Sequence, residues 1–378
     1  MLNILVVIGT RPEAIKLSPI VLELQKHSDK IYVEICITAQ HRSLLDDVLI
    51  NFNITSDHDL DLMSDNQTLE EISSKSLTGI SSILKQRSFD WILVQGDTST
   101  ALSASLSGFY NRVKVGHIEA GLRTYNKWEP YPEEINRQLI SKIADLHFAP
   151  TLNAKNNLSL EGVEEETIIV TGNTVVDSLA IASDSQPSKH IQNILDTNHP
   201  NKKIIAITAH RRENFGKPLT MICEAIKKLA NKYHNECHFI YPVHPNPNVQ
   251  ATAYNVLNNI SNISLIEPLD YFDFIHLLKQ SFLIITDSGG IQEEAPSLQI
   301  PVFILRNNTE RTEGILNKVG LILGTDKENI ITEVSKVIDS ESEYHQYIQA
   351  SNPYGDGQAS TRIVNKLLSY PYSEFVES

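Results

Sequence analysis

Short apolar runs alternate with longer helix-like stretches along almost the whole chain, and this alternation restricts the possible fold most. The runs are nearly continuous in hydrophobic, β-branched residues, which is typical of parallel strands covered by helices on both faces. The predicted strands are residues 3–8, 32–38, 91–95, 114–118, 146–150 and 167–170, and then 203–208, 238–242, 263–266, 282–286 and 302–305. The sequence therefore predicts an α/β protein.

The strands fall into two series, which indicates two domains. The chain has 378 residues, and at roughly 100 to 200 residues per domain it is long enough for two cores. A stretch rich in Ser, Asn, His and Pro, residues 183–201, lies between the series, so we place the junction just before it, near 172–200. Ligands of such sheets bind beyond the carboxyl ends of the strands. We therefore expect the active site in the cleft between the domains.

Charge and cysteine content disfavour several classes of protein. The 46 acidic and 32 basic side chains give a formal charge of −14, and no basic block is present, which argues against nucleic-acid or acidic-membrane partners. The three cysteines are widely spaced and form no CxxC pair, so neither a disulfide framework nor a zinc ribbon is supported. No signal peptide is evident, and no apolar stretch approaches the ~18 residues of a membrane helix. We expect a cytoplasmic protein.

Two loops suit the binding of phosphate groups. The turn after the first strand contains Gly9 and Arg11, and a guanidinium beside a helix N-terminus suits a diphosphate, although a structural salt bridge is the alternative. Ser288, Gly289 and Gly290 follow a later strand and open a helix, so their backbone N–H groups can approach an anion closely. A plain tight turn is the alternative here. Glu294, one turn into that helix, is either a ribose ligand or a favourable acid near a helix N-terminus.

Three carboxylates follow strand ends or lie in the loops after them: Asp97, Glu119 and Glu133. Each alone is typical of a helix cap or a surface acid. On one sheet edge, their mutual repulsion would raise the pKa of at least one, as general acid/base pairs require. Arg123 and Arg137 are near in sequence and could compensate this charge, which is the structural alternative.

Another candidate, His210, begins a His-Arg-Arg cluster after the first strand of the second series, where it would bind leaving-group phosphates.

Other chemistries lack support. His117 and Glu119 form an H-x-E, but the P-C-x-x-C of zinc deaminases is missing, so no metal site is expected. The glycine spacings of dinucleotide folds and P-loops are absent from the sequence, as is the G-x-S-x-G of serine hydrolases.

Several long strings coincide with one family. The chain closely resembles the non-hydrolysing UDP-N-acetylglucosamine 2-epimerases of bacteria. The matching strings are GTRPEAIKLSP (9–19), AQHRSLLD (39–46), QGDTST (95–100), HIEAGLRT (117–124), YPEEINR (131–137), TGNTVVD (171–177), AHRRENFG (209–216), PVHPNPNV (242–249), PLDYFDF (268–274), TDSGGIQEEAPSL (286–298) and NPYGDGQAS (352–360). They are in order and span nearly the whole chain.

The resemblance implies two facing Rossmann-like domains of the GT-B type. Residues 1–172 would carry the catalytic acids, 173–360 would bind UDP, and 361–378 would form a helix and tail that pack back on the first domain. It implies reversible epimerisation of UDP-GlcNAc to UDP-ManNAc at C2 through a 2-acetamidoglucal, with no cofactor and no metal. The product would supply ManNAc for surface polysaccharide, and the enzyme would be a homodimer.

Site residues are carried over by matching positions in these strings. The catalytic positions correspond to Asp97, Glu119, Glu133, His210 and Arg137, and the UDP-binding positions to Arg11, Lys16, Ser288, Gly289, Gly290 and Glu294. Many relatives bind a second UDP-GlcNAc as an activator, and Gln40, Arg211 and His244 match parts of that site. The alternatives are a hydrolysing 2-epimerase that releases ManNAc and UDP, a glycosyltransferase of the same architecture, and a non-catalytic sugar-nucleotide sensor.

Overall fold

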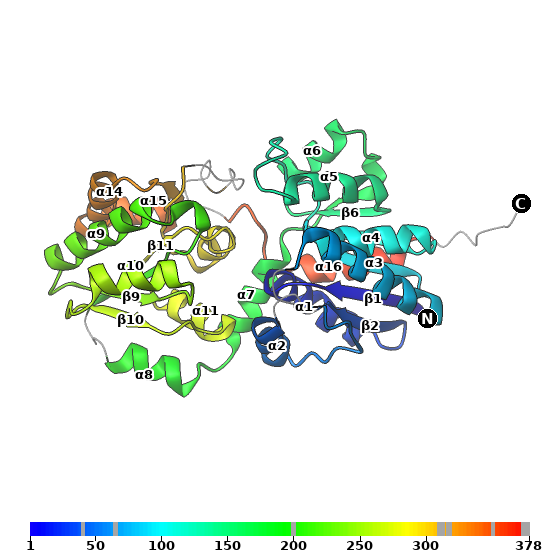
Figure 1. The fold of residues 1–378 in the computed structure, drawn as a ribbon, viewed down its shortest axis with the longest axis horizontal. Helices are drawn as coiled ribbons and strands as arrows, with labels where there is room; N and C mark the ends of the chain where they lie inside the picture. The colour runs from blue at the N-terminus through cyan, green and yellow to red at the C-terminus, as the bar shows by residue number, and fades with distance from the viewer. Residues whose placement is uncertain are drawn as a thin grey trace, which may run out of the picture. The chain divides into compact units, whose positions relative to one another are not determined.

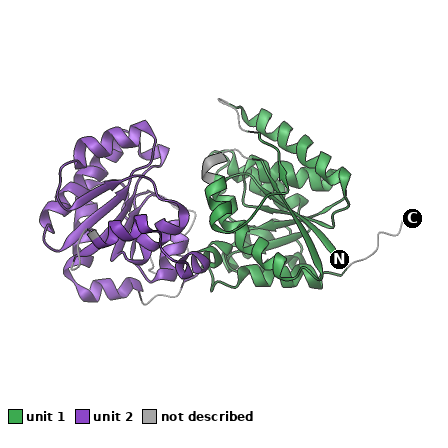
Figure 2. Ribbon diagram, turned by 90° about the horizontal axis from the view of Figure 1, so that it is seen from below, with its two compact units in different colours: residues 1–178, 354–378 green, residues 179–353 purple. Residues whose placement is uncertain are grey.

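The computed structural model describes residues 1–38, 42–62, 67–197, 202–307, 314, 320–348 and 352–371. The chain forms two compact units (Figure 2). The first comprises Met1–Ser178 and Tyr354–Ser378, and the second comprises Leu179–Pro353. The changeover from the first unit to the second is at Ser178/Leu179, and the return is at Pro353/Tyr354, compared with the expected boundaries after residues 172 and 360.

The described part of the first unit contains a seven-stranded sheet in the order β3-β2-β1-β4-β5-β6-β7, with every neighbouring pair parallel. Its strands are β1 (Leu2–Ile8), β2 (Ile31–Ile37), β3 (His58–Asp59), β4 (Trp91–Gln95), β5 (Lys114–Ile118), β6 (Leu146–Ala149) and β7 (Ile168–Val170). Its helices are α1 (Arg11–Lys26), α2 (Arg42–Asn51), α3 (Leu69–Gln86), α4 (Ser99–Tyr110), α5 (Glu133–Ile143), α6 (Leu152–Leu160) and α16 (Ala359–Ser369), with a 3₁₀ turn at η1 (Glu165–Thr167).

Strand β1 shows why its sequence is apolar throughout. Leu5 and Val7 belong to a core cluster with side chains of α3, α4 and α5, which pack side by side. Successive strand residues point to opposite faces, and Ile4, Val6 and Ile8 are also fully buried. Helix α1 packs against α2 and α16. Two groups of helices thus enclose the sheet (Figure 1), as the continuous hydrophobic pattern predicts.

The second unit repeats this arrangement with a six-stranded sheet in the order β10-β9-β8-β11-β12-β13, again parallel throughout. Its strands are β8 (Lys203–Thr208), β9 (Cys237–Pro242), β10 (Ile263–Ile266), β11 (Leu283–Thr286), β12 (Val302–Ile304) and β13 (Gly320–Ile322). Its helices are α8 (Lys189–Thr197), α9 (Lys217–Lys232), α10 (Pro247–Leu257), α11 (Tyr271–Lys279), α12 (Ile291–Glu294), α14 (Lys327–Asp339) and α15 (Glu341–Ile348), with 3₁₀ turns at η2 (Arg212–Asn214) and η3 (Ala295–Leu298).

The α/β class and the two Rossmann-like sheets are confirmed. Each predicted strand is present, with both ends within one residue of the prediction. Two short strands, β3 and β13, were missed. Residues 183–201 were expected to be a polar junction, but they contain α8, whose Ile191 is fully buried. No helix in the described ranges is long and apolar enough to cross a membrane.

The chain passes from the first unit to the second within helix α7 (Thr174–Asp184) and returns just before α16. Asp177 in α7 accepts hydrogen bonds from the backbone N–H groups of Ala359 (3.2 Å) and Ser360 (2.8 Å) at the start of α16. Within the first unit, α16 packs against α1, and the ring of Tyr370 meets Trp91 edge-on at 5.1 Å. These contacts attach the last helix to the first unit.

Candidate active site

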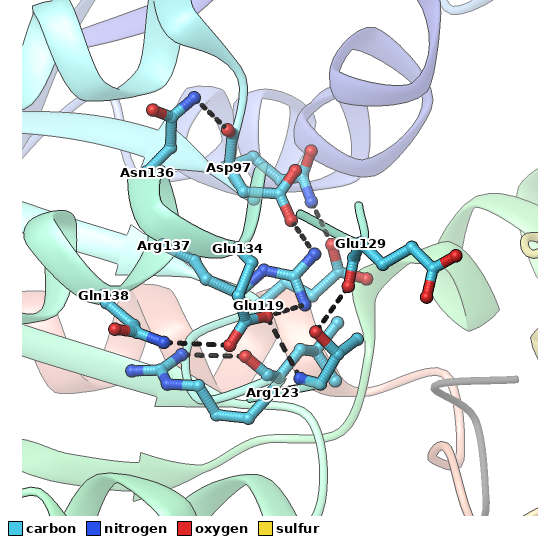
Figure 3. A network of polar contacts seen from close by, with 12 residues as sticks. Asp97, Glu119, Arg123, Glu129, Glu134, Asn136, Arg137 and Gln138 are labelled. Atoms are coloured by element: carbon cyan, nitrogen blue, oxygen red, sulfur yellow. Dashed lines mark hydrogen bonds and ion pairs between the residues drawn. The ribbon is translucent and has the colours of Figure 1, made fainter. Parts of the chain in front are cut away.

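Three neighbouring strands of the first sheet, β1, β4 and β5, end at the same edge. Arg11 is the first residue of α1, just after the turn that follows β1, and the loops after β4 and β5 carry Asp97 and Glu119. Helix α5, which packs beside α4, begins with Glu133. The tertiary structure therefore brings the three predicted carboxylates to one region of the first unit. Figure 3 shows the polar contacts of Asp97 with Asn136 and Arg137 of α5, and Glu119 in the same region.

Glu119 is buried and receives hydrogen bonds from three different parts of the chain. Lys16 of α1 contacts Oε1, Gln95 at the end of β4 contacts Oε2, and Asn173 donates to Oε1 over 2.8 Å. Its backbone has a φ of +63°, which is uncommon for a residue with a side chain. Lys16 was assigned to UDP binding, but in this structure its ammonium contacts Glu119. Glu119 is therefore a carboxylate held in a fixed position by its neighbours.

The loop after Glu119 returns sharply at Gly121, which has a φ of +91°. A Cβ atom there would lie 2.2 Å from the carbonyl oxygen of Ala154 in α6. Only glycine therefore fits between β5 and α6 at this point. This close approach fixes where the Glu119 loop leaves the sheet.

Asp97 forms an ion pair with Arg137 of α5, with 2.5 Å between Oδ2 and the guanidinium nitrogen. Asn136 donates a hydrogen bond to the Asp97 backbone carbonyl over 2.9 Å. Burial raises the pKa of Asp97, Arg137 opposes the shift, and the charges of Glu119 and Glu133 add to it. The expected clustering of like charges is thus present, and it acts on Asp97.

Adjacent glutamates at the start of α5 have different environments. Glu134 is fully buried, and its carboxylate accepts the backbone N–H groups of Thr124 and Tyr125, each over 3.0 Å, so it holds the preceding loop. Glu133 is half-buried, and its Oε2 atom is shielded from solvent with no hydrogen-bond partner among the described residues. A buried carboxylate oxygen without a partner is costly in a purely structural role. Glu133 is therefore the better candidate for contact with a ligand.

The two arginines that could compensate these charges have different partners. Arg137 pairs with Asp97 and also lies 3.5 Å from Glu134. Arg123 instead makes a bidentate pair with Glu161, with both distances 2.7 Å, and contacts Ser141 at 2.9 Å. The suggestion that Arg123 neutralises the acids is wrong, because its guanidinium braces α5 and α6.

One buried acid was not singled out from the sequence. Glu13, in the first turn of α1, accepts hydrogen bonds from the Gly9 backbone N–H (3.2 Å) and the Thr98 hydroxyl (2.8 Å). It therefore joins the loop of Arg11 to the loop of Asp97. Burial raises the pKa of Glu13 to about 7, although these hydrogen bonds and those with Thr10 oppose the shift. The sequence signal was weak, because an acid in a first helical turn is ordinary.

His117, two residues before Glu119, is fully buried, and its Nε2 lies 2.7 Å from the carbonyl oxygen of Gly96. Burial lowers the pKa of His117 to about 3, so the ring is neutral at physiological pH. Nε2 must then carry the proton that it donates to Gly96. Within the described ranges, no group of three or more His, Cys, Asp or Glu side chains could hold a metal ion.

The second unit has its own polar centre, at Asp287 just after β11. Its Oδ2 accepts the backbone N–H groups of His210 and Arg211, each over 2.8 Å, and the side chain of Asn214 over 3.0 Å. The neighbouring strands β8 and β11 place these loops side by side. Asp287 is fully buried. It was missed as a site residue, although it follows a strand directly, and it sets the position of the His210 backbone.

The predicted phosphate cradle has the expected local form, a strand followed by a loop and a short helix start. Gly290 precedes α12, and the space where its Cβ would lie is open. The backbone N–H of Ser288 donates a hydrogen bond to the Thr286 hydroxyl over 2.9 Å. Glu294 is buried and accepts a hydrogen bond from the Tyr271 hydroxyl over 3.1 Å. Ser288, Gly289, Gly290 and Glu294 therefore belong to one loop-and-helix segment of the second unit.

His210 and His244 lie in contact through their rings. The ring centroids are 5.1 Å apart and the planes make an angle of 14°. A candidate catalytic residue and a candidate effector residue are therefore adjacent in the second unit. Arg211, also assigned to the effector, follows His210 directly, whereas Gln40 lies outside the described residues.

Comparison with known proteins yields consistent relatives over the full chain. Residues 22–368 match the family model described as UDP-N-acetylglucosamine 2-epimerase. A UDP-N-acetylglucosamine 2-epimerase of Yersinia pestis is 47% identical over 377 residues, which is 98% of this chain and 99% of the relative. The crystal structure of UDP-GlcNAc 2-epimerase from Neisseria meningitidis bound to UDP-GlcNAc is 44% identical with a TM-score of 0.92, covering 98% of this chain and 100% of that one. The Methanocaldococcus jannaschii enzyme in complex with UDP-GlcNAc and UDP is 34% identical with a TM-score of 0.81, covering 97% and 99%.

The raised pKa of Glu13 predicts a pH-dependent stability. The carboxyl has a pKa of about 7 in the folded chain, against an ordinary value of 4.5, so the native state binds more protons between these limits. The free energy of unfolding should therefore fall as pH rises from about 4.5 to 7, by about 3 kcal/mol from this group. Glu13→Gln removes this contribution, and its stability should vary less over that interval.

Tryptophan fluorescence during urea unfolding measures this effect, because both tryptophans, Trp91 and Trp128, lie in the first unit. Glu164→Gln, at an exposed acid between α6 and η1 of the same unit, is the matched control and should follow the wild-type pH dependence. Parallel pH curves for wild type and Glu13→Gln would show that folding does not raise the pKa of Glu13.

Proposed function

Because this chain belongs to the UDP-N-acetylglucosamine 2-epimerase family, we propose that it is a non-hydrolysing isomerase that interconverts UDP-GlcNAc and UDP-ManNAc. The observation that carries the proposal is the grouping of Asp97, Glu119 and Glu133 in the first unit. Burial raises the pKa of Asp97, and the charge of Arg137 opposes this shift. Such a group can take up and deliver protons near neutral pH.

The substrate dictates an indirect route. Carbon 2 of GlcNAc has no adjacent carbonyl, so its proton is not acidic enough for simple removal and return. In the proposed first step a base takes the C2 proton as the C1–O bond breaks, and UDP leaves with the bonding electrons to give 2-acetamidoglucal. In the second step a proton is delivered to the opposite face of C2 while the UDP oxygen adds to C1. The sum is an inversion at C2 with no net gain or loss.

This route requires a base, an acid and retention of the departing anion. We assign the proton transfers to the carboxylates of Asp97, Glu119 and Glu133, with Arg137 holding Asp97. Lys16 lies with them through its contact with Glu119. The side chain of Asp97 is largely buried but still 24% accessible, and one buried oxygen of Glu133 has no partner among the described residues. Both observations support contact with a substrate.

The departing UDP needs positive groups and N–H donors. We assign this role to Arg11 in the first unit, and to Ser288, Gly289, Gly290 and His210 in the second. Glu294 would accept hydrogen bonds from the ribose hydroxyls. The side chain of His210 is 37% exposed, and its Nδ1 lies 3.7 Å from Oδ1 of Asp287. No cofactor and no metal enter this scheme.

The wider setting follows from the family resemblance alone. We propose that the product supplies ManNAc units for a surface polysaccharide, and that the enzyme works in the cytoplasm as a homodimer.

The reaction itself is tested by proton NMR of UDP-GlcNAc incubated with the purified protein in D₂O. UDP-ManNAc should appear, and deuterium should enter C2 of both sugar nucleotides, because each passage through the glycal exchanges that proton with solvent. Accumulation of free ManNAc with UDP would identify a hydrolysing enzyme. Binding of UDP-GlcNAc without any exchange would instead identify a sugar-nucleotide sensor, and transfer only to an added acceptor a glycosyltransferase.

Amide substitutions should separate chemistry from binding. We expect Asp97→Asn, Glu119→Gln and Glu133→Gln each to lower kcat by ~10² or more, since a general acid or base contributes roughly 10² to 10⁴. The Kd for UDP, measured by calorimetry, should change little. Glu129→Gln is the matched control, because Glu129 is exposed in the same loop. Near-normal kcat in any of the three variants would assign that residue a structural role.

We also propose that a second UDP-GlcNAc binds at Arg211 and His244, supported by the contact of His244 with His210. The forward rate should then be sigmoidal in UDP-GlcNAc, and pure UDP-ManNAc should react slowly until traces of UDP-GlcNAc are added. Coupling between sites is typically ~1 to 3 kcal/mol, or about 5- to 150-fold. Arg211→Ala should make the curve hyperbolic. A wild-type curve that is already hyperbolic, with no lag from UDP-ManNAc, would contradict the effector site.

A further inference from the structure

Asn173 is a buried polar residue to which the proposed reaction gives no role. It is 3% exposed and lies directly before α7, the helix in which the chain leaves the first unit. Its side-chain Nδ2 donates to Oε1 of Glu119 over 2.8 Å, and its Oδ1 accepts the backbone N–H of Val175 over 3.1 Å. One amide thus contacts both a proposed catalytic carboxylate and the first turn of α7.

The orientation of this amide is fixed by its partners. The carboxylate of Glu119 can accept but not donate when ionised, and the N–H of Val175 can only donate. The nitrogen must therefore face Glu119 and the oxygen must face α7. Each partner alone requires this orientation, and the two requirements agree.

The backbone of Asn173 is held as firmly as its side chain. Its N–H donates to the carbonyl oxygen of Tyr354 over 2.7 Å. At the preceding residue, Gly172, a Cβ would lie only 3.2 Å from the Cα of Gly355. The outgoing and returning segments of the chain are thus in close contact here, within the first unit. Glu119 is hydrogen-bonded to a residue anchored at this crossing.

The two roles of the Asn173 amide have different chemical requirements. Starting a helix requires only a side-chain oxygen, which serine or aspartate supplies as well as asparagine. Donating to Glu119 requires an N–H at the end of a side chain of this length, which neither of them has. The helix start therefore accounts for the oxygen of Asn173 but not for its nitrogen.

We propose that Asn173 is a positioning residue for Glu119, holding its Oε1 in the orientation needed for proton transfer and anchoring it to the start of α7. The inference rests on the proposed function of Glu119. Lys16 and Gln95 hold the same carboxylate from α1 and β4, and Asp97 and His117 are the other titratable groups named near it. Asn173 differs from these because it lies where the outgoing segment of the chain contacts the returning segment at Tyr354 and Gly355.

The test uses two variants that keep the helix start and lose the donor. Asn173→Ser retains an oxygen for Val175 but cannot reach Glu119, and Asn173→Asp places a second carboxylate against it. We expect kcat to fall about tenfold or more in Asn173→Ser, in keeping with the loss of a hydrogen bond to a charged group. The fall should be larger in Asn173→Asp, and KM for UDP-GlcNAc should stay within about threefold of wild type.

A second readout separates positioning from general damage. Loss of a donor disfavours the ionised form of a carboxylate, so the limb of the kcat–pH profile that Glu119 governs should move to higher pH, by about one unit in Asn173→Asp. Thr174→Val is the matched control: Thr174 is the next residue, is buried, and has a hydroxyl with no hydrogen-bond partner among the described residues. Its kcat, its pH profile and its melting temperature should match wild type.

The outcomes distinguish this inference from the proposed function. Wild-type protein that fails to exchange the C2 proton of UDP-GlcNAc would overturn the function itself. If wild type exchanges it, and Asn173→Asp has the wild-type kcat and pH profile, Asn173 does not position Glu119. A lower kcat with an unchanged pH profile and a melting temperature reduced in proportion would also overturn the inference, because the effect would then be structural.

Discussion

The first unit is organised around the burial of the Glu119 carboxylate. Removing a charge from water is costly unless hydrogen bonds and an opposite charge compensate it. Lys16, Gln95 and Asn173 provide this compensation, and they come from α1, from β4 and from the residue before α7. The acid can be held only if these elements are in place, so the fold and the proposed proton-transfer group depend on the same contacts.

The second unit also contains a buried carboxylate that accepts several hydrogen bonds, but this one holds backbone groups. Asp287 is fully buried and accepts the backbone N–H groups of His210 and Arg211, so a carboxylate again fixes the loop that follows a neighbouring strand. Here the held group is a backbone, and its side chains carry the positive charge. In both units, catalytic candidates sit on loops whose positions are set by buried acids rather than by the loops' own packing.

The proposed elimination makes two demands, and the candidate residues for each lie in different units. Carboxylates with neighbouring negative charge suit the movement of protons, whereas a glycine-rich loop with nearby imidazole and guanidinium groups suits an oxyanion. In one compact group these requirements would oppose each other, because positive charge that binds a diphosphate lowers the pKa of adjacent acids. The contact of Arg137 with Asp97 shows this opposition on a small scale, since burial raises the Asp97 pKa and Arg137 counters it.

The sequence by itself determined the α/β class, the two series of strands and most of the candidate site. Periodicity and the residues just after strands are local signals. Glu119 directly follows a strand, and Asp97, His210 and Ser288 each lie two residues beyond one. Only the tertiary structure decided the partners of these residues. Arg123 and Arg137 are equally near the acids in sequence, yet one braces Glu161 and the other pairs with Asp97. The burial of Glu13, the role of Asp287 and the contact of Asn173 with Glu119 also depend on segments far apart in the chain, whose approach no local pattern encodes. The short strands β3 and β13 escaped prediction for the same reason, because two or three residues form a strand only when a neighbouring strand pairs with them.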